Sequence, residues 1–156
     1  AYGCAGQRCM AASLMIAVGE VQPIVDQIAA ITRKLKLGED MGPVISSAAV
    51  DRIHRYIDGA EQLGARVLVD GRRPQAVGGK GWWVGPTILD HVRPDMPAGC
   101  EEIFGPVLSI VRARTVDEAI AIENASPYGN AASIFTSSGA VARHCIERFQ
   151  AGSSST

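Results

Sequence analysis

Short apolar runs alternate with longer amphipathic stretches along most of this chain. Residues 13–18, which include the run LMIAV, have the unbroken apolar character of a buried parallel strand. Similar short runs, bounded by turn residues, predict further strands. These strands are expected at residues 66–69, 87–90, 107–111 and 131–136.

The stretch after the first strand has helical periodicity. Its apolar residues recur at steps of four, three and four, which places them on one helix face that should pack on a sheet. The helix is expected to end near Gly38. Its apolar face consists of Ile24, Ile28, Ile31 and Leu35.

A second helix is expected to begin after Ser46, which can cap it, and to end at Gly64. Its apolar stripe comprises Val50, Ile53, Ile57, Ala60 and Leu63.

Two more helices are expected towards the end of the chain. Thr115 and Glu118 form a capping box that starts one of them, and Asn124 or Ser126 ends it. The final helix carries an apolar face made of Ala142, Cys145, Ile146 and Phe149.

Alternating strands and helices predict an α/β fold, with a mostly parallel sheet flanked by helices on both faces. A chain of 156 residues, 47% of them hydrophobic, is long enough to bury one core of this kind. We expect a single domain at residues 1–150, followed by a short tail at 151–156. Residues 70–85, rich in Gly, Arg and Pro, are expected to form a surface loop or hairpin.

Charge and cysteine spacing narrow the classes of partner. The formal net charge is −1 and no long Lys/Arg run occurs, so neither nucleic acid nor an anionic membrane is an expected partner. The 4 cysteines have neither the paired spacing of a zinc site nor the density of a disulfide-stapled domain. We expect free thiols and no metal site.

Cys9 is the sharpest candidate for chemistry. It lies in a Gly-containing turn beside Arg8, ahead of a short Ala-rich stretch that would place the thiol near a helix N-terminus. A neighbouring cation and a helix N-terminus both favour the thiolate, which is the nucleophilic form. The alternative is a small buried apolar residue, which is the commoner role of a lone cysteine.

Two motifs resemble the signatures of the aldehyde dehydrogenases: GQRC at residues 6–9 and EEIFGPV at residues 101–107. Their order and separation match that family, and PYGN at residues 127–130 with IFT at 134–136 fits the segment that follows. The resemblance covers nearly the whole chain and implies the catalytic-cysteine domain of such an enzyme.

The resemblance implies a role for each matching residue. Cys9 would attack the aldehyde carbon, with its backbone N–H as one oxyanion donor, and the tetrahedral adduct would expel hydride to NAD and leave the acyl group on Cys9 as a thioester. Glu102 would bind the nicotinamide ribose and Phe104 would pack near the nicotinamide. Without the resemblance, Glu102 would be a solvated carboxylate and Phe104 a core residue.

Within the family, the chain most resembles the methylmalonate-semialdehyde dehydrogenase branch. The features that match this branch are Arg8, MGPVI at residues 41–45 and VGPTI at residues 84–88. That branch uses coenzyme A as the acyl acceptor and a substrate that carries a carboxylate. Arg8 would bind the carboxylate of this small-molecule semialdehyde, because a planar guanidinium can do so bidentately. Alternatively, Arg8 braces the turn or tunes the thiolate.

A strand–GxGxxG–helix unit is absent from the sequence, so most of the NAD site is expected on another domain. We therefore expect a piece of a larger homo-oligomeric enzyme, dimeric or tetrameric, and no turnover by the piece alone. A cytoplasmic location is expected, or the mitochondrial matrix in a eukaryote. A hydrolytic aldehyde dehydrogenase and an inactive α/β scaffold remain as alternative functions.

Overall fold

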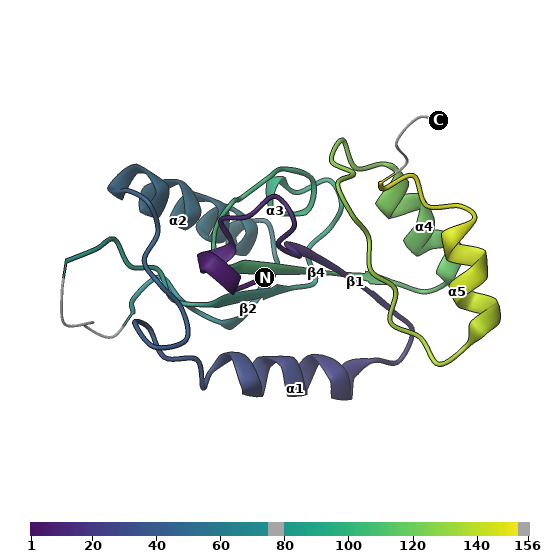
Figure 1. Ribbon diagram of the computed structural model, residues 1–156, viewed down its shortest axis with the longest axis horizontal. Helices are drawn as coiled ribbons and strands as arrows, with labels where there is room; N and C mark the ends of the chain where they lie inside the picture. Colours follow the sequence, from purple (N-terminus) through teal and green to yellow (C-terminus); the bar gives the residue numbers. More distant parts are fainter. Residues whose placement is uncertain (75–79, 153–156) are drawn as a thin grey trace.

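A computed structural model describes residues 1–74 and 80–152 and contains a four-stranded sheet in the order β1-β4-β3-β2 (Figure 1). Strand β4 pairs in parallel with β1 and with β3, and β2 pairs antiparallel to β3. The predicted α/β class with a mostly parallel sheet is confirmed. The strands are β1 Leu14–Val18, β2 Arg66–Val69, β3 Thr87–Asp90 and β4 Val107–Ala113.

Helices cover both faces of this sheet, with α1 (Gln22–Thr32) on one side and α2 (Ser47–Gln62) and the short α3 (Pro97–Cys100) on the other (Figure 1). Successive residues of β4 point to opposite faces, as they must on a pleated strand. Val107 and Val111 join the core beneath α2, whereas the intervening apolar residues join the core above α1. The first five residues of β4 are therefore all buried because the strand is covered on both faces.

The four strands predicted before residue 131 and the helix capped by Ser46 are confirmed. The Ser46 hydroxyl accepts a hydrogen bond from the backbone N–H of Ala49 at 3.1 Å, and Gly64 beyond the helix end has a φ of +99°. A positive φ of this size suits glycine, which has no Cβ. Of the expected loop at residues 70–85, residues 75–79 lie outside the described residues.

Helix α4 (Val116–Asn124) also begins where the sequence predicts. The Thr115 hydroxyl accepts from the Glu118 N–H at 3.1 Å, as a capping box requires. The Glu118 carboxylate accepts instead from the Arg114 N–H at 2.9 Å, one residue before the expected donor. One N–H of the first turn, that of Glu118, is thus capped, and the reciprocal bond goes to Arg114 instead of Thr115.

The predicted apolar face of α1 is wrong at Ile24 and Ile31, whereas Ile28 is partly buried and packs against the core. Ile24 and Ile31 are 51% and 64% exposed, and the buried face consists of Val25, Ala29 and Thr32. The helix thus has two overlapping stripes of residues. The stripe with the smaller side chains, Val25, Ala29 and Thr32, faces the sheet. The helix also ends at Thr32, well before Gly38.

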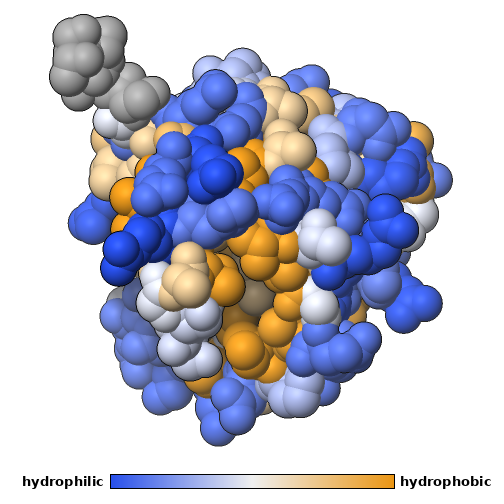
Figure 2. All heavy atoms as spheres, turned by 90° about the vertical axis from the view of Figure 1, so that its right-hand side faces the viewer, coloured by the Kyte–Doolittle hydropathy of each residue, from blue (hydrophilic) through white to orange (hydrophobic). Residues whose placement is uncertain are grey.

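The strand predicted at residues 131–136 is absent. This segment forms no backbone hydrogen-bond ladder with any strand of the described residues. Phe135 is 95% exposed there. Helix α5 (Gly139–Ile146) follows, and of its predicted apolar face Cys145 is buried whereas Ile146 is 70% exposed. Figure 2 shows apolar side chains gathered in a hollow on the side of the molecule where α4 and α5 lie.

Helix α5 is attached to the rest of the molecule mainly through α4. The Asn124 side chain donates to the Arg148 carbonyl at 2.9 Å and accepts from the Gln150 N–H at 2.9 Å. His144 Nε2 lies 2.6 Å from an Asp117 carboxylate oxygen. Asn124 therefore ties the residues that follow α5 to the end of α4.

Asp90 and Arg112 form an ion pair between the central strands, with N–O distances of 2.9 and 2.8 Å. Asp90 is 3% exposed and also accepts from the His91 N–H. Burial by itself raises the pKa of this carboxyl, but its bonds to Arg112 and to the His91 N–H outweigh burial and hold the pKa below its usual value.

Asp90→Asn should lower the free energy of unfolding by about 2 kcal/mol at neutral pH, because it leaves the Arg112 guanidinium without its carboxylate. A depressed folded-state pKa means that the stabilisation is present above the unfolded-state pKa of about 3.9 and is lost as the pH falls through the folded-state value. Urea unfolding should therefore show the gap between wild type and variant closing in acid. Asp95→Asn is the control, because Asp95 pairs with Arg93 on the surface and its loss should change nothing measurable.

Candidate active site

The two signature motifs meet at one edge of the sheet. GQRC lies shortly before β1, and EEIFGPV leads directly into β4. Because β1 and β4 are parallel neighbours, with Leu14 paired to Ser109, both motifs enter the sheet at the same amino-terminal edge. Backbone packing joins them: a Cβ atom on Gly6 would lie 1.9 Å from the carbonyl oxygen of Gly105.

The residues before Cys9 form a left-handed turn. Cys4, Ala5 and Gly6 have φ values of +52°, +53° and +70°, and the Gln7 N–H donates to the Cys4 carbonyl at 3.1 Å. Ala5 is fully buried at the centre of this turn. The turn lets the chain pass close to Gly105 before it reaches Cys9.

Cys9 itself is exposed and lies in a second turn, in which the Ala11 N–H donates to the Arg8 carbonyl at 3.0 Å. The chain then enters β1, so the helix expected after Cys9 is absent and its dipole cannot support a thiolate there. The Cys9 backbone N–H donates to none of the described residues. An unpaired N–H beside the thiol is available to an oxyanion.

Gln7 holds the cysteine turn against a neighbouring loop. Its side-chain amide donates to the carbonyls of Cys4 at 3.0 Å and Pro43 at 3.4 Å, and its oxygen accepts from the Ile45 N–H at 2.9 Å. The sequence indicates Gln7 only through its place inside GQRC, and no local pattern predicts these three bonds.

Helix α2 holds the Glu101–Phe104 loop with two side chains that lie one helical turn apart. Arg52 donates to the carbonyls of Ile103 at 3.3 Å and Phe104 at 3.4 Å. The Tyr56 hydroxyl donates to a Glu101 carboxylate oxygen at 2.7 Å, and this bond raises the pKa of Tyr56 to about 12. These contacts fix the loop from its inner side.

The two residues expected to contact the cofactor face outwards. Phe104 is 38% exposed and has a φ of +52°, which is rare for a side chain of this size. Glu102 is exposed and makes no hydrogen bond or ion pair within residues 1–74 and 80–152. A free carboxylate and an open aromatic face fit a ribose hydroxyl and a planar ring.

Arg8 is exposed, and its guanidinium makes no ion pair or hydrogen bond with any described residue. It therefore does not brace the turn through its side chain in the part of the chain that the structure covers. A guanidinium without protein partners is free to bind an anion next to Cys9 in the sequence.

The remaining thiols differ in access. Cys4 is exposed, Cys100 is half-buried with its sulfur 3.2 Å from the Met96 carbonyl oxygen, and Cys145 is buried. None of these cysteines forms a disulfide.

No group of three potential metal ligands occurs among the described residues. None of the described helices is both long enough and apolar enough to span a bilayer.

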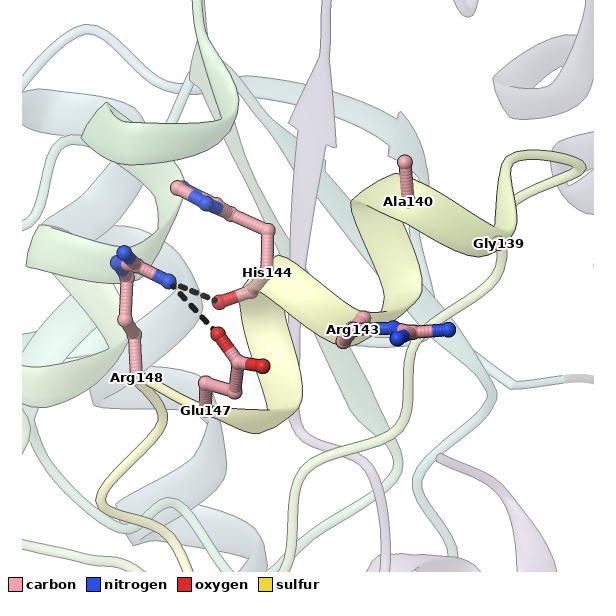
Figure 3. A pocket seen from close by; sticks show the side chains of 6 residues that line it. All are labelled: Gly139, Ala140, Arg143, His144, Glu147 and Arg148. Carbon is pink, nitrogen blue, oxygen red and sulfur yellow. Dashed lines mark hydrogen bonds and ion pairs between the residues drawn. The ribbon is translucent and has the colours of Figure 1, made fainter.

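A separate hollow lies on α5, lined by both charged and small side chains (Figure 3). There Arg148 donates to the His144 carbonyl at 3.3 Å and lies 3.4 Å from Glu147. None of the motif residues lines this hollow, and it carries no part of the candidate site.

Asn130 is the second residue whose role the sequence did not reveal. Its side-chain amide donates to the Cys9 carbonyl at 3.1 Å, across 121 positions of sequence. It belongs to PYGN, whose resemblance to the family indicates no role for this side chain.

The aldehyde dehydrogenase family model matches residues 1–156. The chain is similar to the probable methylmalonate-semialdehyde/malonate-semialdehyde dehydrogenase [acylating], mitochondrial, of Drosophila melanogaster, at 45% identity over 97% of this chain and 31% of that protein. It is also similar to malonate-semialdehyde dehydrogenase 2 of Geobacillus kaustophilus, at 45% identity over 97% of this chain and 33% of the relative.

Among solved structures, a putative methylmalonate-semialdehyde dehydrogenase from Sinorhizobium meliloti 1021, complexed with NAD, matches with a TM-score of 0.90. It is 39% identical, and the match covers 95% of this chain and 32% of that one. The chain thus spans about a third of the length of the relatives that it matches.

Proposed function

This chain belongs to the aldehyde dehydrogenase family, and we therefore propose that residues 1–150 form the catalytic domain of an NAD- and CoA-dependent semialdehyde dehydrogenase. Its substrates are methylmalonate and malonate semialdehyde, and its products are propionyl-CoA and acetyl-CoA with loss of CO2. The observation that carries this proposal is the contact between Gly6 and Gly105, since it brings the nucleophile motif and the cofactor motif together at one edge of the sheet.

In this proposal the Cys9 thiolate attacks the aldehyde carbon, and the Cys9 N–H donates to the oxyanion that forms. NAD, when bound, supplies the acceptor for the hydride that leaves the tetrahedral adduct. Glu102 would bind a ribose hydroxyl through its free carboxylate, and the Phe104 ring would pack near the nicotinamide. The methylmalonyl or malonyl group remains on Cys9 as a thioester. Loss of its carboxylate as CO2, with uptake of a proton at the same carbon, then gives the propionyl or acetyl thioester.

The free guanidinium of Arg8 supports a substrate with a carboxylate. It adjoins the nucleophile in the sequence and makes no ion pair within the described ranges, so a substrate anion would meet no competing protein carboxylate there. Coenzyme A, through its thiol, would then release the acyl group from Cys9. Relatives named as acylating enzymes support this acceptor over water.

Acyl trapping in the full-length enzyme tests the proposal. With NAD and methylmalonate semialdehyde but no coenzyme A, acid quenching should preserve a propionyl adduct, and peptide mass spectrometry should find it on Cys9. Coenzyme A added before the quench should discharge the adduct as propionyl-CoA, because a thiol exchanges readily with a thioester.

Cys4 is the internal control in this experiment, because it is also exposed and lies in the same segment. An adduct on Cys4, or on no cysteine, would refute the assignment of the nucleophile. Release of free propionate at the same rate with and without coenzyme A would refute the acylating reaction and favour a hydrolytic one.

A further inference from the structure

We propose that Asn130 is a positioning residue for the Cys9 thiol, an inference that rests on the proposed function only for its catalytic consequence. The Asn130 amide donates to the Cys9 carbonyl at 3.1 Å. No other described residue bonds to that carbonyl. One side chain therefore sets the orientation of the peptide that follows the nucleophile.

The cysteine turn offers little else to hold this peptide. The backbone hydrogen bond of the turn joins the Ala11 N–H to the Arg8 carbonyl and does not involve Cys9. The Cys9 N–H itself is unpaired among the described residues. Because ψ of Cys9 sets the angle between its carbonyl and its Cα–Cβ bond, holding the carbonyl restricts the direction of that bond. Without the anchor, the thiol would sample several directions.

Asn130 reaches Cys9 from a segment that is itself held in place. The Gly129 carbonyl accepts from the Gly152 N–H at 2.6 Å, and the Tyr128 N–H donates to the Ser126 hydroxyl at 3.2 Å. These bonds lie between α4 and the turn after α5. The residues around α4 thereby support the nucleophile, although they contribute no group that touches the substrate.

The test measures alkylation of Cys9 by iodoacetamide in the 156-residue chain, with Cys4 as the internal reference. Asn130→Asp keeps the shape of the side chain and removes the donor, and Asn130→Ala removes the donor without adding charge. Both variants should slow Cys9 alkylation about threefold to tenfold, a factor in keeping with the loss of one hydrogen bond. The rate at Cys4 should not change.

Gln22→Glu is the matched control. It likewise turns a side-chain amide into a carboxylate and removes a donor, here the bond to Asp26, but it lies beyond the far end of β1 and belongs to none of the bonds that hold the Asn130 segment. It should leave both alkylation rates unchanged. An unaltered Cys9 rate in the Asn130 variants, or equal changes at Cys4 and Cys9, would overturn the positioning role.

In the full-length enzyme, Asn130→Asp should lower kcat about tenfold and leave KM for NAD unchanged, because the cofactor loop is held by α2 and not by Asn130. If KM for NAD rose by the same factor by which kcat fell, Asn130 would have a general structural role, and the proposal would be overturned. If the wild-type enzyme forms no acyl group on Cys9, the proposed function fails, and the alkylation rates still decide whether Asn130 positions the thiol.

Discussion

Replacing Gly6 by alanine should lower the free energy of unfolding by about 3 kcal/mol or more, through both overpacking and backbone strain. The added Cβ would lie 1.9 Å from the Gly105 oxygen and 2.9 Å from the Ala1 oxygen. Both obstacles are backbone atoms, which cannot rotate away as a side chain can. The φ of +70° adds strain of its own for any residue with a Cβ.

Urea unfolding of the purified chain measures this effect, and Gly3→Ala is the matched control. Gly3 lies in the same turn, but a Cβ there would have no heavy atom within 4 Å. Gly3→Ala should therefore stay close to wild type. Equal stability of the two variants would mean that the cysteine turn does not pack against Gly105, and the main support for the proposed site would be lost.

Arg8→Leu in the full-length enzyme should depress kcat/KM for methylmalonate or malonate semialdehyde by roughly 30- to 1000-fold, on the order of 2–4 kcal/mol. The proposed contact is charge-assisted, and no described carboxylate competes for the Arg8 guanidinium. Propanal lacks the carboxylate and never makes the contact, so its kcat/KM should fall far less. Steady-state kinetics with both aldehydes provides the measurement.

The comparison between the two substrates separates substrate binding from damage to the turn. Arg8→Lys adds a second control, because it keeps the charge and loses the bidentate geometry. If propanal and the semialdehydes lose the same factor, Arg8 acts on the thiolate or on the turn, and its role as a carboxylate ligand is wrong.

Local chemistry made several elements predictable from the sequence. Ser46 and Thr115 cap helices through bonds that span only three residues, and strand β4 carries apolar side chains on both of its faces. The aldehyde dehydrogenase family was likewise identifiable from two short motifs, GQRC and EEIFGPV. Information of this kind is contained within a few consecutive residues.

The site was only partly predictable for the same reason. Cys9, Glu102 and Phe104 lie within recognisable motifs, and their roles remain proposals that rest on the resemblance. The helix expected after Cys9 does not form, because the Ala-rich stretch lies in the turn that leads into β1. A few alanines favour a helix, but the pairing of β1 with β4 outweighs that preference.

By itself, the sequence determined the strands up to residue 111, the caps, the family and the motif residues, because each depends on near neighbours along the chain. The tertiary structure alone decided which stripe of α1 is buried, that residues 131–136 form no strand, and that Gly6 meets Gly105. It alone also brought Asn130 to the Cys9 carbonyl. These outcomes depend on surfaces and hydrogen-bond partners far away in the sequence, which no local pattern specifies.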